Sequence, residues 1–139
     1  MVKEFIAEHE AVTDLAEAAV RRLVAGEVDT AQAMVAPMAE QLRSHWKGEE
    51  DGLFAVMKVD AEYTDYIAAL EREHRELDAF LAALDLHDPR RRAEFVAAMD
   101  ELRHHIAKEE DGLFPASLTA LDGDEWNATM AAWRDAHPG

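Results

Sequence analysis

A histidine and a glutamate at helical spacing occur twice in this chain. Residues 42–54 read LRSHWKGEEDGLF and residues 102–114 read LRHHIAKEEDGLF, so one motif is repeated. In each copy a glutamate follows a histidine by four residues, as His45 with Glu49 and His105 with Glu109. On an α-helix such residues lie on one face about one turn apart, so the imidazole and the carboxylate of each pair point into the same space.

Two facing helices with these pairs would bring imidazole nitrogens and carboxylate oxygens together. Imidazole suits iron, zinc and copper, and carboxylate adds hard oxygen character and can bridge two ions. The chain contains no cysteine, which excludes a disulfide framework, an iron-sulfur cluster and a thiolate zinc site. The pattern therefore predicts a metal site built from His, Asp and Glu side chains.

The elements that must position these side chains are helices. Apolar residues recur at helical spacing through nearly the whole chain, and no segment shows sustained strand alternation. The sequence predicts an all-α fold. We expect long helices at about 3–25, from after residue 29 to beyond 53, at about 61–84 and from residue 89 to beyond 113, with a short tail helix at about 124–136.

Local signals indicate where the helices begin and end. Gly26 is expected to end the first helix. Asp29, with Gln32 three residues later, is expected to cap the start of the second. The clearest start is that of the fourth helix, where Asp88 precedes Pro89.

Four long helices joined by short loops favour antiparallel neighbours, so we expect an up-down-up-down four-helix bundle with a short C-terminal helix. Such bundles build metal sites in the core, from side chains on facing helices. Each long helix carries a histidine on its inward stripe, and the candidate metal ligands are His9, His45, Glu49, His74, His105 and Glu109. Burying these groups without a cation would cost on the order of several kcal/mol each, which favours a metal over a purely structural role. We expect no catalytic residue separate from these ligands.

The remaining histidines are assigned no ligand role. His87 and His137 are expected to be solvated, in a loop and in the tail respectively. His104 adjoins His105 but is turned about 100° from it on a helix, which places it beside the inward stripe.

The residues that follow the two glutamates leave alternatives open. Glu50 and Glu110 are turned about 140° from the preceding histidine, so we expect them on the flanks unless a local distortion of the helix exchanges them with their neighbours. Gly52 and Gly112 either leave room for close helix packing or a small ligand, or end the helix.

The pattern resembles the hemerythrin-like (HHE cation-binding) family, whose bacterial members carry the signature H, HxxxE, H, HxxxE on four successive helices. Here the signature is His9, His45 with Glu49, His74, and His105 with Glu109. The resemblance covers essentially the whole chain and implies a centre of two non-haem iron ions with an oxo or hydroxo bridge. It further implies that the histidines are terminal ligands and that the two glutamates bridge the irons. The length of 139 residues fits a single domain, 1–139.

One position departs from the animal oxygen carriers of this family. They have a further histidine one turn after the third-helix histidine, where this chain has Asp78. With four histidines, two bridging glutamates and one bridge, about two positions stay open on a pair of octahedral irons. This places simple oxygen carriage in doubt. For Asp78 itself, ligation, orientation of an imidazole and a solvated helix face all remain open.

Three functions fit these observations. The first is an enzyme that consumes small oxidants such as hydrogen peroxide or nitric oxide. The second is a non-catalytic module that binds or senses oxygen, nitric oxide or iron, and the third is a helical protein without iron. A sensor usually needs an output domain or a flexible segment, and the sequence contains no low-complexity tract. We therefore favour an enzyme or a stand-alone binder, with small diatomic or peroxide molecules as ligands.

Charge and hydropathy exclude some classes of binding partner and indicate a location. The formal net charge of -16 disfavours nucleic acid and anionic membrane surfaces, because both would be repelled. The first residues, MVKEFIAEHE, lack an apolar signal core, and no apolar run approaches the roughly 20 residues needed to span a bilayer. We expect a cytoplasmic protein without an obligate protein partner.

Overall fold

The computed structural model describes residues 2–137, and these residues form helices without any strand. The all-α prediction is confirmed. The elements are α1 (Val2–Val24), α2 (Val28–Gly48), the π-helical turn η1 (Glu49–Phe54), α3 (Ala55–Met57), α4 (Ala61–Ala82), α5 (Pro89–Lys108), the π-helical turn η2 (Glu109–Leu113), α6 (Phe114–Ala120) and α7 (Gly123–Ala136). Within the described residues, no helix is both long and apolar enough to cross a membrane.

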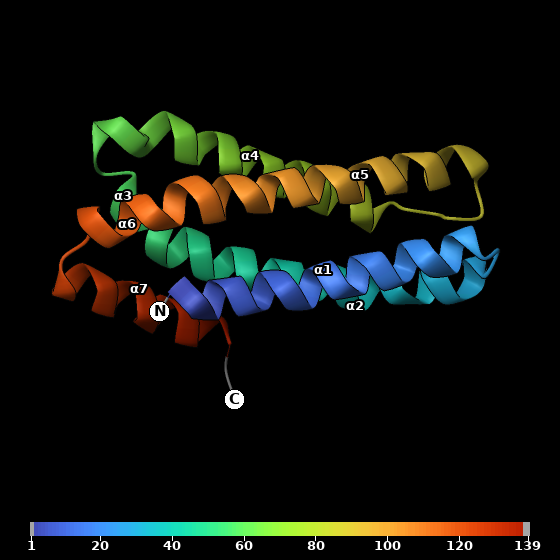
Figure 1. The fold of residues 1–139 in the computed structure, drawn as a ribbon, viewed down its shortest axis with the longest axis horizontal. Helices are drawn as coiled ribbons and strands as arrows, with labels where there is room; N and C mark the ends of the chain where they lie inside the picture. The colour runs from blue at the N-terminus through green and yellow to red at the C-terminus, as the bar shows by residue number, and fades with distance from the viewer. Residues whose placement is uncertain (1, 138–139) are drawn as a thin grey trace.

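The four long helices run lengthwise beside one another (Figure 1). Helix α1 contacts α2 and α5, and α4 contacts the same two helices. The connection between α1 and α2 and the one between α4 and α5 lie at the same end of the molecule (Figure 1). At the other end, α7 packs against α2 and η1.

Three predicted helix boundaries are confirmed. Gly26 follows α1 with a φ of 85°, a left-handed conformation that glycine adopts without steric cost. Asp60 caps α4 by accepting a hydrogen bond from the backbone N–H of Glu62. Asp88 caps α5 in the same way from Arg90, and Pro89 occupies the first turn.

The predicted cap of the second helix is wrong. Helix α2 begins at Val28, so Asp29 lies inside its first turn, and no side chain caps the helix. The amide of Gln32 is used elsewhere, because its Nε2 donates to the carbonyl of Leu84 at 3.1 Å and its Oε1 accepts from the N–H of Leu86 at 2.7 Å. Gln32 thus satisfies backbone groups of the α4–α5 connection, a distant partner that local spacing does not reveal.

Two apolar clusters fill the core and divide it along the helix axes. The larger cluster contains Val12, Leu42, Leu81 and Leu102, among others. The smaller cluster contains Phe5, Leu53, Phe54, Met57, Ile67, Leu70, Leu113 and Phe114. In α1 and α4 the inward histidine lies between residues of the two clusters in sequence, whereas α2 and α5 carry residues of the larger cluster and lead to the smaller one through the π-helical turns. The core therefore holds four imidazoles in a polar layer between two apolar blocks.

Candidate metal centre

The six predicted ligands lie together in this layer, and all of them are buried. They are contributed by every long helix and both π-helical turns: His9 from α1, His45 from α2, Glu49 from η1, His74 from α4, His105 from α5 and Glu109 from η2. The two glutamates are fully buried, with no exposed surface.

The histidines approach one another in two pairs through their Nε2 atoms. The Nε2 atoms of His9 and His45 are 2.8 Å apart. Those of His74 and His105 are 3.0 Å apart. Four ring nitrogens of one kind thus converge on a shared volume from four different helices.

Each buried glutamate contacts both histidine pairs. Glu49 Oε1 lies 3.0 Å from His45 Nε2 and 3.7 Å from His74 Nε2. For Glu109, Oε1 lies 2.6 Å from His105 Nε2 and Oε2 lies 3.2 Å from His9 Nε2. Glu109 Oε1 also lies 3.7 Å from His74 Nε2. The two glutamates therefore lie between the histidine pairs, where a carboxylate can reach two ions at once.

The carboxylates of Glu49 and Glu109 are not satisfied by the protein. None of their four oxygens accepts a hydrogen bond from the residues that the structure describes. Burial and the neighbouring charge of Glu109 raise the pKa of Glu49 well above its usual range. Burial also pushes the pKa of Glu109 upward, but Glu49, His105 and other contacts lower it well below its usual range. A cation between the carboxylates would relieve both the missing bonds and the repulsion, and imidazole nitrogen with carboxylate oxygen suits iron.

A π-helical turn begins at each of these glutamates. Helix α2 continues directly into η1 and α5 into η2, with right-handed helical dihedral angles at the junctions. The distortion considered from the sequence is therefore present, since a π-turn bonds i to i+5. It does not exchange the glutamates, because Glu49 and Glu109 stay buried while Glu50 and Glu110 remain partly exposed.

On the outer side, every one of the four histidines directs its Nδ1 atom at a further carboxylate. We call these residues the outer carboxylates, and the contacts are Glu8 with His45 at 3.1 Å, Glu110 with His9 at 3.2 Å, Glu50 with His74 at 3.4 Å and Glu73 with His105 at 2.9 Å. A carboxylate on Nδ1 holds a proton there, leaves the Nε2 lone pair free for a metal and raises the basicity of the ring.

Sequence reasoning missed two of the outer carboxylates, Glu8 and Glu73. Each directly precedes a predicted ligand in the chain, as Glu8 precedes His9 and Glu73 precedes His74. Their contacts, however, are with histidines of the neighbouring helices. The two Glu-His dipeptides are visible in the sequence. The contacts that they make can be identified only when the positions of the neighbouring helices are known.

Aromatic side chains cover the imidazoles. The ring of His74 is stacked between Trp46, at 4.8 Å between centroids, and Phe54, at 5.7 Å. His9 stacks on Phe114 at 5.7 Å with an interplanar angle of 8°. These apolar surfaces exclude water and lower the local dielectric constant, which strengthens electrostatic contacts within the layer.

The structure also places the other candidate residues. Asp78 is at the surface, with 42% of its side chain exposed, and it accepts a hydrogen bond from Arg43 Nη1 at 3.1 Å. It is not among the clustered residues, and the solvated helix face is its observed position. His104 is exposed, as predicted.

Two of the histidines expected to be solvated have partners. His87 is 57% exposed but contacts Asp29 at 2.7 Å and Asp85 at 2.9 Å. His137 is half-buried and contacts Glu8, so its assignment as a solvated tail residue is wrong. The cause is α7, which returns along α2 and carries the tail back to the core.

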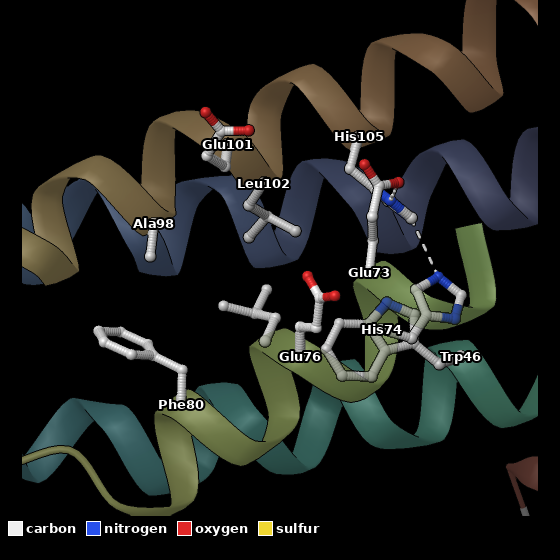
Figure 2. Close-up of a pocket in the computed structure, with 10 residues that line it drawn as sticks. Trp46, Glu73, His74, Glu76, Phe80, Ala98, Glu101, Leu102 and His105 are labelled. Carbon is white, nitrogen blue, oxygen red and sulfur yellow. Dashed lines mark hydrogen bonds and ion pairs between the residues drawn. The ribbon is translucent and has the colours of Figure 1, made fainter. Parts of the chain in front are cut away.

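A pocket of about 250 Å³ opens between α4 and α5 beside one histidine pair (Figure 2). His74 and His105 lie at one end of it, and Phe80 and Ala98 lie towards the other (Figure 2). Glu73 and Trp46 also line it, so it is bounded by both polar and apolar groups. This pocket leads from the surface to the His74 and His105 side of the layer.

Comparison with known proteins identifies one related family. A family model described as Hemerythrin HHE cation binding domain matches residues 1–117. The matched range contains all six clustered residues and ends before α7. No match was found among curated proteins or among solved structures.

Proposed function

The chain belongs to the hemerythrin HHE cation-binding family, and we propose that its buried cluster holds two non-haem irons joined by an oxo or hydroxo bridge. In this proposal His9 and His45 bind one iron, and His74 and His105 bind the other. The two buried glutamates bridge them. The observation that carries the proposal is that each glutamate contacts both histidine pairs while its own oxygens accept no hydrogen bond.

The proposal includes the architecture that presents these ligands. Residues 1–139 form a single domain in which the four long helices make an up-down-up-down bundle. The contacts of α1 and α4 with both α2 and α5 support this arrangement. The net charge of -16 supports the further proposal that neither nucleic acid nor an anionic membrane is a partner.

We further propose that the centre reacts with small oxidants, with hydrogen peroxide as the first candidate and nitric oxide and oxygen as others. When bound, the irons would supply redox chemistry at the positions that protein ligands leave open. The surface position of Asp78 supports this proposal, because His74 is the one α4 residue among the described groups that could hold a metal ion. The α4–α5 pocket offers small molecules a path to His74 and His105.

The residues of the chain would act on the reaction through position and charge. The outer carboxylates keep the Nδ1 protons of the histidines in place and so orient the rings. The aromatic rings beside His9 and His74 limit the access of water. Together these groups would hold a largely enclosed site that small molecules reach through the α4–α5 pocket.

The test is the release of oxygen from hydrogen peroxide by iron-loaded protein, followed with an oxygen electrode. We expect many turnovers per chain. The variant His105→Ala should lose most of this activity, because it removes a ligand. The matched control is His104→Ala, which removes the adjacent exposed imidazole and should behave as wild type. Iron-loaded protein that binds oxygen reversibly and leaves peroxide untouched would instead establish a non-catalytic binding module.

A further inference from the structure

Helix α7 lies outside the range matched by the hemerythrin family, 1–117, yet it reaches the polar layer of the core. It packs against both α2 and η1, which carry His45 and Glu49. In Figure 1 it runs along the end of the molecule beside the first turns of α1.

The first link runs through Glu8, the outer carboxylate of His45. Glu8 Oε1 lies 3.1 Å from His45 Nδ1 and accepts a hydrogen bond from Trp133 Nε1 at 2.8 Å. Its other oxygen, Oε2, contacts His137 Nε2. The rings of Trp133 and His137 stack on one another at 4.4 Å. Both oxygens of Glu8 are therefore held by the last turn of α7 and the residue that follows it.

The second link is close packing against the α2–η1 segment. A Cβ atom added to Gly52 would lie 2.8 Å from the carbonyl oxygen of Thr129, and one added to Gly48 would lie 3.3 Å from Trp133 Cδ1. Glycines at these two positions let α7 approach the π-turn that begins with Glu49. Of the roles considered for Gly52 from the sequence, close helix packing is the one observed.

The opposite half of the layer is supported differently. Glu73, the outer carboxylate of His105, accepts a hydrogen bond from Lys108 Nζ at 2.7 Å. The carbonyl of Lys108, just before η2, accepts one from Tyr66 Oη at 2.8 Å. These contacts come from α4 and α5 rather than α7. The two halves of the layer thus have separate supports.

We propose that α7 is a clamp for one half of the centre, in which Trp133 and His137 are positioning residues that act on His45 through Glu8. This inference rests on the proposed two-iron site. It assigns unequal stability to the two irons, because the contact of α7 through Glu8 acts on the iron held by His9 and His45 and not on the one held by His74 and His105.

The test measures release of iron from reduced, iron-loaded protein to an excess of a chelator that becomes coloured on binding iron. The variant Trp133→Phe removes the N–H donor and keeps an aromatic ring. We expect it to release one of the two irons about three- to tenfold faster than wild type, somewhat less than direct loss of an outer carboxylate would give. The second iron should be released within about twofold of the wild-type rate.

The matched control is Trp126→Phe, the same change on the same helix at a residue without a contact to Glu8 among the described contacts. It should release both irons as wild type does. In a Glu8→Ala background, Trp133→Phe should add no further acceleration, because the link through Glu8 is already broken. Equal melting temperatures of the two tryptophan variants would show that the difference is not general unfolding.

Two results would overturn the clamp while leaving the two-iron site intact: wild-type release by Trp133→Phe, or equal acceleration of both irons. An added effect of Trp133→Phe in the Glu8→Ala background would also overturn it, because Trp133 would then act by another route. Wild-type protein that binds no pair of irons would overturn the proposed function itself, and the clamp with it.

Discussion

At the scale of single residues, the centre depends on which atom of a histidine each carboxylate faces. Glu49 and Glu109 face Nε2 atoms and are fully buried. Glu50 and Glu110 face Nδ1 atoms and are partly exposed. Two consecutive glutamates in each motif thus differ in role: the first contacts Nε2 atoms inside the layer, and the second contacts an Nδ1 atom on its outer side.

This difference predicts the effect of removing each glutamate. Glu49→Ala or Glu109→Ala should abolish the binding of a pair of irons, because each would remove one of the two proposed bridging ligands. Glu50→Ala or Glu110→Ala should retain the pair with an affinity about 10- to 100-fold weaker, the usual effect of losing a partner of a ligating histidine. Iron content and chelator competition measure both effects. Equal loss in all four variants would contradict the distinct roles.

The sequence predicted the six clustered residues because i,i+4 spacing and an inward stripe are properties of one helix. It did not predict the contact of Glu8 with His45 or that of Glu73 with His105, because these bonds cross between helices. It also left the role of Asp78 open. In the structure this side chain is exposed and forms an ion pair with Arg43. Spacing along a chain predicts which side chains share a helix face, but it does not predict which side chains of the neighbouring helix contact them.

At the scale of elements, the helices and most of their ends follow local chemistry, whereas the π-turns do not. Asp88 and Gly26 act through a hydrogen bond and a dihedral angle of adjacent residues, so their roles could be predicted. The turns η1 and η2 follow the ligand-bearing helices, where a glutamate is fully buried between helices. Their cause is tertiary, and the sequence could only raise a distortion as an alternative.

Because α7 packs closely against η1, a single methyl group added at Gly52 should lower the stability of the protein. Gly52→Ala would place a Cβ 2.8 Å from the carbonyl oxygen of Thr129, so we expect a loss of about 1–3 kcal/mol in the free energy of unfolding. Gly123→Ala is the control, because no atom lies within 4 Å of its added Cβ, and it should be neutral or slightly stabilising. Urea denaturation measures both. If the two variants were equally stable, α7 would not be held closely against η1.

The α4–α5 connection predicts a pH-dependent contribution to stability. Hydrogen bonds with Asp29 and Asp85 raise the pKa of His87 above its ordinary value. The stabilisation is therefore fully present below the unfolded pKa, about 6.5, and is lost as pH rises through the higher folded pKa.

Wild type should thus exceed His87→Ala in stability more at pH 5.5 than at pH 9, as measured by urea denaturation. NMR titration of the His87 ring should show the raised pKa, and Asp29→Asn should lower it. A titration midpoint of His87 that does not change in Asp29→Asn would contradict the ion pair between the start of α2 and this connection.

At the scale of the whole molecule, the fold encloses four imidazoles and two carboxylates between two apolar clusters. The apolar clusters stabilise the helices on either side, but the polar layer between them costs free energy unless its charges are compensated. A metal that binds only the folded protein would turn this layer into a source of stability.

Removal of iron should therefore lower the melting temperature by about 10 °C or more, since a ligand at about 1,000 times its Kd adds about 4 kcal/mol. Differential scanning calorimetry of iron-loaded and chelator-stripped protein measures the shift. Identical melting temperatures would mean that the layer is already stable without a cation, although its buried carboxylates accept no hydrogen bond.

The two-iron centre is tested most directly by the iron content of protein purified from cells grown with ample iron, together with its Mössbauer spectrum. The geometry of two histidine pairs joined by two glutamates predicts about two irons per chain, in a spectrum of one magnetically coupled pair. A single iron per chain, or zinc alone, would contradict the account.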